Sequence, residues 1–368
     1  MANSKLFECD WVSPPGDTIQ DALEELGMSQ VEFAERTGFS KKHVNGLIKG
    51  NVAITAETAL KLESVLGAPA AFWLRREMEY RADLARKKML DEASKHTDWL
   101  KEFPLADMAK FGWIRRHPRD KPRQVIELLH FFGVASVDAW SEHVGKLAPA
   151  FRASDKFAKK RGAVLAWLRR AEVEAQALRL APFDREALLG AIPKLRELTN
   201  EVDPQVFVPR MQEICARCGV AVVFVPAPKG CPASGATWWA SPERAVLALS
   251  LRYKTNDHLW FAFFHELGHL LKHGKKLRFI EGNGLDGLDA DKEQEADTFA
   301  SKALIPDPSI LKELSSGAVS AAQVKSVAKR IGVAAGIVVG RLQHDGIIPY
   351  SHLNGLKVSY VWAKKSRE

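Results

Sequence analysis

The chain has 368 residues, of which 46% are hydrophobic and 27% are charged, and its formal net charge is +8. This composition excludes collagen-like, low-complexity and largely disordered proteins, and the length suits two or three globular domains. Four cysteines are too few for a disulfide framework, and no stretch is apolar enough for a signal-peptide core or a membrane span. We therefore expect a cytoplasmic protein with no membrane segment.

Residues 18–66 are predicted to form four short helices, because their apolar residues recur at helical spacing. Glycines end three of these helices, and hydroxyl side chains that can cap a first turn precede three of them. The residues concerned are Gly27, Ser29, Gly38, Ser40, Gly50 and Thr55. Two short helices joined through a glycine turn are typical of a helix-turn-helix motif.

The second helix of this pair, residues 40–49, is locally basic and could read a DNA groove. Lysines can neutralise phosphates, whereas Asn45 and Gln30 can pair with base edges or phosphates. A plain helical bundle with lysines on its solvated face is the less favoured interpretation of the same spacing. The predicted DNA contacts are Gln30, Ser40, Lys41, Lys42, His43, Asn45 and Lys49.

The stretch GMSQVEFAERTGFSKKHVNGLIKGNVAITAETALKLESVLGAPAAFWL resembles the Xre-type DNA-binding domain of HigA-like antitoxins. This resemblance implies binding to a double-stranded DNA operator as a homodimer, with residues 40–49 as the recognition helix. Net charge does not identify the same region, because residues 1–95 carry −2, residues 96–200 carry +6 and residues 201–368 carry +4.

Residues 96–200 show apolar and basic residues at helical spacing and no chemical motif. Arg115, Arg116, Arg119 and Arg123 lie around two prolines and are predicted to form an exposed basic loop. A solvated surface is the favoured interpretation of this loop, and contact with DNA backbone is the alternative.

The C-terminal half is predicted to contain a small sheet followed by a helix that carries the motif HExxH. The strands are expected at residues 220–225, 236–240 and 245–251, and the helix at residues 257–272. His265 and His269 are four residues apart, so both imidazoles can reach one zinc ion. Glu266 then lies beside the metal, where it can accept a proton from water as the general base. The less favoured alternative is that both histidines lie in the protein core, with hydrogen-bond partners and no metal.

A zinc site of this class needs a third ligand, which we expect on a helix over residues 291–304. Helical phase places Glu293 close to the centre of that helix's apolar face and Glu295 about 120° away. We therefore predict Glu293 as the ligand, with Glu295 as the fallback. Asp297 lies one turn beyond Glu293 and can hydrogen-bond a ligand histidine. His273 continues the four-residue spacing of His265 and His269, but we expect it to lie beyond the metal.

The segments WFAFFHELGHLLKH and EQEADTFASKALIP resemble the ImmA/IrrE family of zinc metallopeptidases. This resemblance implies a gluzincin-like fold and a cytoplasmic protein substrate such as a DNA-bound repressor or an antitoxin. Carried over by position, it also implies zinc ligands at His265, His269 and Glu293 and a catalytic base at Glu266. No electrophile matches by position, and the candidates are Tyr253, His258 and His273.

Together these features predict an α+β, mainly helical protein with four parts: a helix-turn-helix domain, a helical connecting region, a metallopeptidase core and a C-terminal helical region with a short β tail. The expected boundaries are 1–95, 96–200, 201–310 and 311–368. The predicted function is a DNA-binding regulator fused to a zinc endopeptidase that cleaves a repressor or antitoxin.

Two alternatives remain open. The metallopeptidase fold could serve without catalysis as a sensor or as the binding site for a cognate toxin. The N-terminal domain, with its net charge of −2, could instead bind protein.

Overall fold

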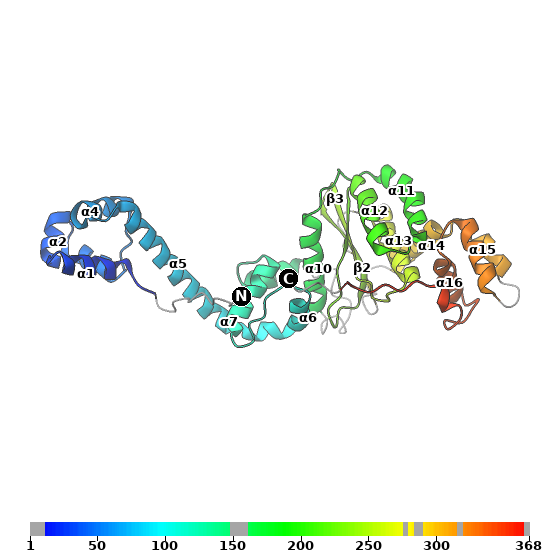
Figure 1. Cartoon of the computed structure of the whole chain (residues 1–368), viewed down its shortest axis with the longest axis horizontal. Coiled ribbons are helices and arrows are strands. Elements are labelled where there is room, and N and C mark those ends of the chain that lie inside the picture. Colours follow the sequence, from blue (N-terminus) through cyan, green and yellow to red (C-terminus); the bar gives the residue numbers. More distant parts are fainter. Residues whose placement is uncertain (1–11, 148–160, 275–278, 283–289, 315–318, 364–368) are drawn as a thin grey trace, which may run out of the picture. The chain divides into compact units, whose positions relative to one another are not determined.

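The computed structural model describes residues 12–147, 161–274, 279–282, 290–314 and 319–363. The chain divides into two compact units, residues 1–96 and residues 97–368, and each is described by itself (Figure 1). The prediction of a mainly helical fold with a small sheet is confirmed. Within the described ranges, no helix is both long enough and apolar enough to cross a bilayer.

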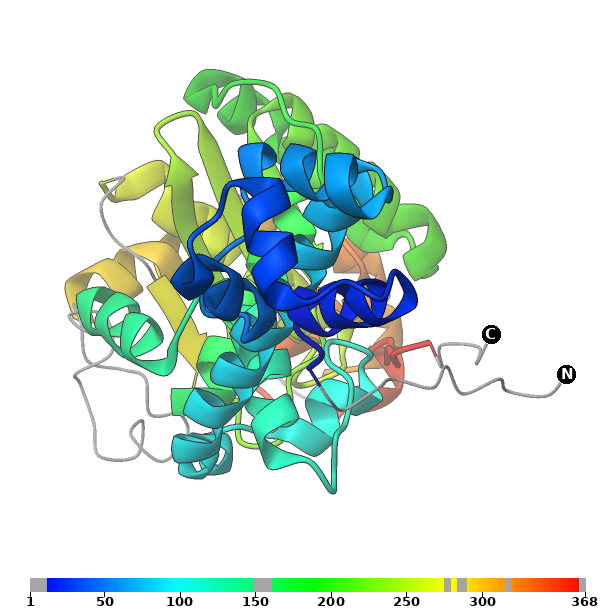
Figure 2. The same cartoon turned by 90° about the vertical axis from the view of Figure 1, so that its left-hand side faces the viewer.

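The N-terminal unit is a helical bundle (Figure 2). Its core includes Ile19, Phe33, Leu47 and Trp73. The side chains of Ser29, Ser40 and Thr55 each accept a hydrogen bond from a first-turn amide, as the sequence predicts. The helices are α1 (Pro15–Glu25), α2 (Gln30–Thr37), α3 (Lys41–Ile48), α4 (Ala56–Leu66) and α5 (Ala70–Lys95).

The second unit begins with short helices around an aromatic cluster. Rings of Trp99, Phe103, Phe132 and Trp140 lie 5.1 to 6.3 Å apart between centroids, mostly edge to face. The predicted basic loop before α7 is exposed, although Arg123 belongs to the helix itself. The helices are α6 (Leu105–Lys110), α7 (Lys121–Phe132), α8 (Val137–Leu147) and α10 (Arg161–Gln176).

A four-stranded sheet forms the centre of the second unit, in the order β1-β3-β2-β4. Strands β1 and β3 run parallel, whereas β2 runs antiparallel to both β3 and β4. The sequence predicts the first three strands with slightly different ends and misses the fourth. The strands are β1 (Val220–Phe224), β2 (Ala233–Ser241), β3 (Arg244–Leu249) and β4 (Phe279–Gly282).

Helices cover both faces of this sheet. Alternate strand residues such as Ala221, Val223 and Val246 pack against α10, while Val222 and Leu247 pack toward the opposite layer. That layer contains α11 (Arg185–Glu197), α12 (Pro204–Arg217), α13 (Asn256–Lys272), α14 (Ala290–Leu304), α15 (Ala321–Ile331) and α16 (Ala335–His344).

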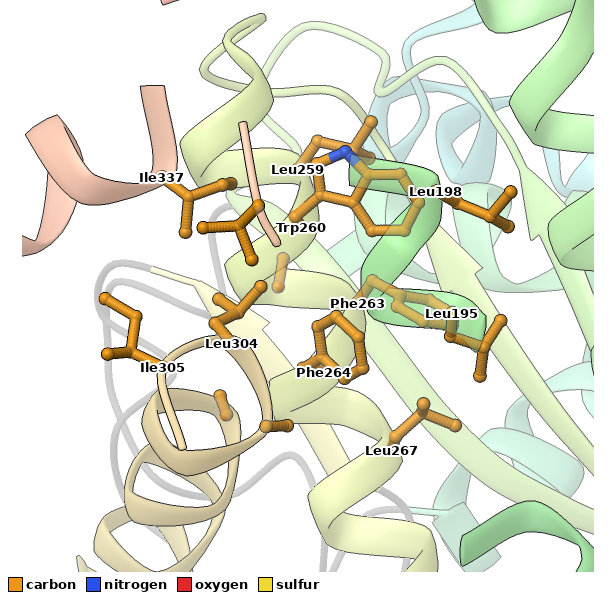
Figure 3. Close-up of a cluster of buried hydrophobic side chains, with 14 of the residues drawn as sticks. Leu195, Leu198, Leu259, Trp260, Phe263, Phe264, Leu267, Leu304, Ile305 and Ile337 are labelled. Atoms are coloured by element: carbon orange, nitrogen blue, oxygen red, sulfur yellow. The ribbon is translucent and has the colours of Figure 1, made fainter. Parts of the chain in front are cut away.

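Helix α13 runs through the middle of the larger core. Its side chains Trp260, Phe263, Phe264 and Leu267 are fully buried and pack among leucines and isoleucines of neighbouring helices (Figure 3). Of its 17 residues 14 are buried, so other elements enclose the helix on nearly every side. The polar residues in its middle are therefore surrounded by packed side chains.

The start of α13 is fixed by a segment near the end of the chain. The amide of Asn256 donates to the carbonyl of Val358 at 2.8 Å, and the amide of Val358 donates back to Asn256 Oδ1 at 3.1 Å. Lys357 Nζ forms a buried ion pair with Asp257 Oδ2 at 2.6 Å. This closing segment, residues 357–360, therefore anchors the helix that carries the HExxH motif.

Candidate metal centre

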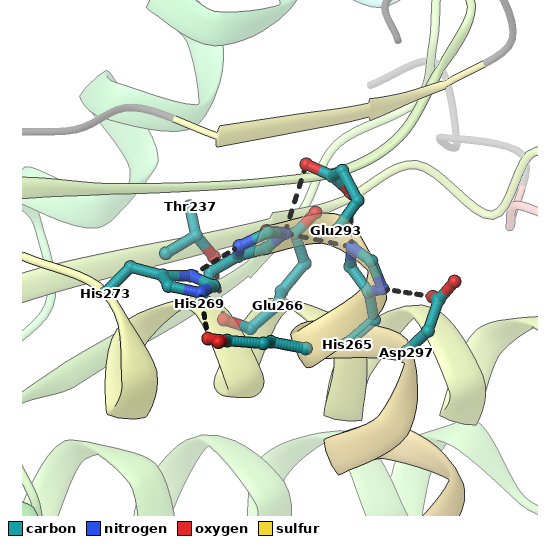
Figure 4. Close-up of polar contacts among 8 residues, drawn as sticks. Thr237, His265, Glu266, His269, His273, Glu293 and Asp297 are labelled. Carbon is teal, nitrogen blue, oxygen red and sulfur yellow. Dashed lines mark hydrogen bonds and ion pairs between the residues drawn. The ribbon is translucent and has the colours of Figure 1, made fainter. Parts of the chain in front are cut away.

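Two histidines of α13 and one glutamate of α14 point toward a common centre (Figure 4). The Nε2 atoms of His265 and His269 lie 3.0 Å apart. Glu293 approaches both, with Oε2 at 3.2 Å from His265 Nε2 and Oε1 at 3.5 Å from His269 Nε2. The structure thus brings together the three side chains that the sequence nominates as ligands, with Glu293 rather than Glu295 facing the histidines.

These distances suit a tetrahedral zinc ion. Donor atoms at about 2.0–2.1 Å from such an ion lie roughly 3.3 Å from one another. Two imidazoles and one carboxylate also leave a fourth position for water or substrate, which is the arrangement of catalytic zinc sites. Among the described residues, this is the one group of histidines, cysteines and acids that could hold a metal.

The candidate ligands favour the protonation states that bind metal. Burial lowers the pKa of His269 below its ordinary value, although the hydrogen bond to Glu293 acts in the opposite direction. Burial alone would raise the pKa of Glu293, but hydrogen bonds and charge from His265 and His269 together outweigh it and lower the pKa to about 2. At neutral pH these effects favour a neutral imidazole and an ionised carboxylate.

Each candidate histidine ligand is also held through its other ring nitrogen. His265 Nδ1 lies 2.8 Å from Asp297 Oδ1, at the position the sequence predicts for that carboxylate. His269 Nδ1 lies 3.0 Å from His273 Nδ1, and His273 Nε2 lies 3.1 Å from Glu295 Oε2. His273 therefore lies beyond the candidate ligands, and Glu295 contacts His273 instead of the metal position.

Glu266 is fully buried beside strand β2. The hydroxyl of Thr237 donates to the backbone carbonyl of Glu266 at 3.4 Å, which ties the helix to the strand. A Cβ atom added to Gly235 would lie 2.6 Å from Glu266 Oε1 and 2.8 Å from its Cγ. Glycine at position 235 therefore provides the space that the Glu266 side chain occupies, a contact that the sequence alone does not reveal.

If Glu266 is the base of a peptidase, Gly235→Ala should lower cleavage by about 10²-fold, because the new methyl group must displace the Glu266 carboxylate by roughly an ångström. Zinc content should stay at the wild-type level, since Glu266 is not one of the candidate ligands. The matched control is Gly190→Ala in α11, where an added Cβ meets nothing within 4 Å. Equal cleavage by the Gly235 variant and the wild type would show that this contact does not position Glu266.

The other nominated electrophiles lie apart from the ligand group. The rings of Tyr253 and His258 stack with centroids 4.5 Å apart, and both side chains line a small pocket with Ser234 and Ala262. Burial lowers the pKa of His258. These residues are neighbours on the loop before α13 and on its first turn, whereas the candidate ligands begin two turns further along the helix.

Most side chains nominated for DNA contact lie on α3 or at its two ends, whereas Gln30 is the first residue of α2. Gln30, Lys41, Lys42 and Asn45 are exposed, and the hydroxyl of Ser40 accepts a hydrogen bond from the amide of His43 at 3.1 Å. A shallow pocket on this surface is lined by residues that include Ser40, Lys42, His43, Asn45, Lys49 and Asn51. Asn51 follows the helix and belongs to this lining. The sequence analysis does not nominate it, because helical periodicity does not mark a loop residue.

Comparisons with known proteins match a different family in each of the two units of the chain. A family model described as a helix-turn-helix matches residues 19–73, and one described as an IrrE N-terminal-like domain matches residues 215–343. The second match contains both α13 and α14. Each family therefore accounts for one of the two regions with candidate functional residues.

One curated relative is an uncharacterized HTH-type transcriptional regulator, YddM, of Escherichia coli strain K12. It is 40% identical over 60 residues, which cover 16% of this chain and 64% of the relative, slightly less than two thirds of its length. A solved structure of a HigA-family addiction module antidote protein from Coxiella burnetii is 29% identical, covers 23% of this chain and 92% of its own, and has a TM-score of 0.21. The chain joins an Xre-like helix-turn-helix domain at its N-terminus to a peptidase M78 domain of the IrrE and ImmA type at its C-terminus.

Proposed function

We propose that the protein is a DNA-binding transcriptional regulator whose C-terminal domain is a zinc endopeptidase acting on a repressor or antitoxin-type protein in the cytoplasm. The observation that carries the peptidase proposal is a buried glutamate, Glu266, on the same helix as two histidines that meet a third candidate ligand. A purely structural zinc site would have no need of Glu266.

In this proposal His265, His269 and Glu293 would hold a zinc ion, which would supply a Lewis acid for the scissile carbonyl and for the attacking water. Glu266 accepts the proton of the attacking water and passes it to the departing amine. Burial beside Gly235 keeps the Glu266 carboxylate in one place for both transfers. Asp297 holds the ring of His265 in the orientation that leaves Nε2 directed at the metal.

The peptidase proposal is tested with the full chain and the proteins encoded beside it or controlled by its operator. Zinc-loaded protein should cut one of them at a defined bond, and a chelator should stop the reaction. If fully loaded protein cuts none of them, the alternative of a non-catalytic antitoxin or repressor that binds metal or a cognate toxin is favoured.

The proposal of operator binding rests on the exposed polar and basic side chains of α3. Their setting matches the helix-turn-helix family model, and the curated relative is named as a transcriptional regulator of the same type. We propose that two copies of the chain bind a double-stranded operator, with residues 40–49 in the major groove.

Replacing Lys41 and Lys42 together with alanine should weaken operator binding and reduce the slope of log K against log salt by about four units, because the two bound copies together lose four lysines and each phosphate contact releases roughly one counterion. The measurement is a fluorescence-anisotropy titration at several salt concentrations. Lys87→Ala with Lys88→Ala, in the exposed part of α5, is the charge-matched control. Unchanged affinity in the Lys41 and Lys42 variant would contradict groove binding and favour a protein partner for this domain.

A further inference from the structure

The two candidate histidine ligands are supported in different ways. His265 meets a carboxylate directly, whereas His269 meets another histidine, which in turn meets a carboxylate. Histidines that bind metals nearly always donate their second ring N–H to a partner that fixes the ring and its tautomer. For His269 that partner is an imidazole, a group that can either donate or accept at each nitrogen.

Metal binding would determine the direction of the hydrogen bonds in this chain. His269 Nε2 faces the other candidate ligands, and a metal held there would need its lone pair, so the His269 proton would lie on Nδ1. His269 Nδ1 then donates to His273 Nδ1, and His273 Nε2 donates to Glu295 Oε2. In these contacts the protons on His269 Nδ1 and His273 Nε2 each meet an acceptor.

We propose that His273 and Glu295 are positioning residues that set the orientation and tautomer of His269. This inference rests on the proposed metal centre and adds two residues to its support. His273 and Glu295 form a relay in which Glu295 acts only through His273.

The local fold favours this role. Helix α13 ends at Lys272, and the next residue, His273, has an extended backbone with φ −112° and ψ 158° while its amide still donates to the carbonyl of His269. The imidazole of His273 is only 3% exposed, although it lies at a helix end. Helix α14 then provides the ligand Glu293 and both supporting carboxylates, Glu295 and Asp297, within five residues.

Exposure sets the relative size of the expected effects. The Glu295 side chain is 62% exposed, so water can replace part of its interaction with His273. The imidazole of His273 is enclosed, so water cannot replace it as readily. Loss of His273 should therefore weaken zinc binding more than loss of Glu295.

The test is a zinc-affinity measurement by chelator competition on the full chain. His273→Phe should weaken affinity by about 10- to 100-fold, and Glu295→Ala by a smaller factor of at least about threefold. The double variant should match His273→Phe alone, because Glu295 has no route to the metal without His273. Glu295→Gln should retain most of the affinity, since its amide oxygen still accepts the His273 proton.

Asp291→Ala is the matched control, because it removes an exposed carboxylate from the first turn of the same helix. Its zinc affinity should remain within about twofold of the wild type. Three results would overturn the relay: an unchanged affinity in His273→Phe, additive losses in the double variant, or an equal loss in Asp291→Ala and Glu295→Ala.

A second measurement separates the relay from the proposed metal centre. In zinc-loaded protein, histidine ¹⁵N chemical shifts should report a proton on Nδ1 of His269 and the Nε2–H tautomer for His273. In His273→Phe the His269 Nδ1 proton should exchange faster with solvent, because its acceptor is gone. A wild type that binds no zinc would contradict the metal centre, whereas an Nδ1–H tautomer for His273 in the zinc-loaded wild type would contradict the relay.

Discussion

Glu266→Gln should lower cleavage by about 10²- to 10⁴-fold while the protein keeps its zinc. Glutamine has nearly the same shape as glutamate, so the buried space beside Gly235 remains filled. Its carboxamide cannot accept a proton at neutral pH, and the attacking water therefore loses its base. The measurement is the initial rate of substrate cleavage together with metal analysis of the same preparation.

Glu313→Gln is a suitable control, because Glu313 is exposed and forms an ion pair with Arg330 away from the metal centre. It should cleave at the wild-type rate. Undiminished cleavage by Glu266→Gln would contradict the proposed mechanism. Loss of zinc from Glu266→Gln would instead make Glu266 a ligand.

Lys357→Met should lower the free energy of unfolding by about 3–5 kcal/mol, because it leaves a buried carboxylate without its cation. Lys357 and Asp257 are 11% and 8% exposed, and their charged atoms are 2.6 Å apart. Asp257 has little room to move toward water, since a Cβ atom at Gly340 would lie only 2.7 Å from its Oδ2. Methionine preserves much of the volume of lysine, so the change mainly removes charge.

Urea unfolding followed by tryptophan fluorescence measures this loss, with Trp260 of α13 as a reporter in the affected core. Lys325→Met, at an exposed position of α15, should change stability by less than about 0.5 kcal/mol. Combining Lys357→Met with Asp257→Asn should recover part of the loss, because the uncompensated charge is gone. A loss below about 1 kcal/mol in the single variant would show that water screens the pair.

Features that depend on helical periodicity were accessible from the sequence. The spacing of His265 and His269 requires only that the segment be helical, and the phase of α14 was enough to favour Glu293 over Glu295. The hydroxyl caps of the N-terminal helices were predictable for the same reason, because a cap depends on residues within one turn.

Features that depend on how helices and strands pack against one another could not be predicted from the sequence. The pairing of His273 with Glu295 arises because α13 ends just before His273 and α14 passes close to that end. The space that Gly235 leaves for Glu266 depends on the distance between a strand and a helix. Strand β4 has four residues, too few for a period-two pattern to stand out.

The anchoring of α13 by residues 357–360 also sets an order of events during synthesis. The ribosome releases the HExxH helix well before the segment that holds its first turn, by several seconds at about 5–20 residues per second. The N-terminal unit has its own core and leaves the ribosome before either of these segments. We therefore expect a growing chain to form its helix-turn-helix unit first and to complete the candidate metal centre only after residues 357–360 emerge.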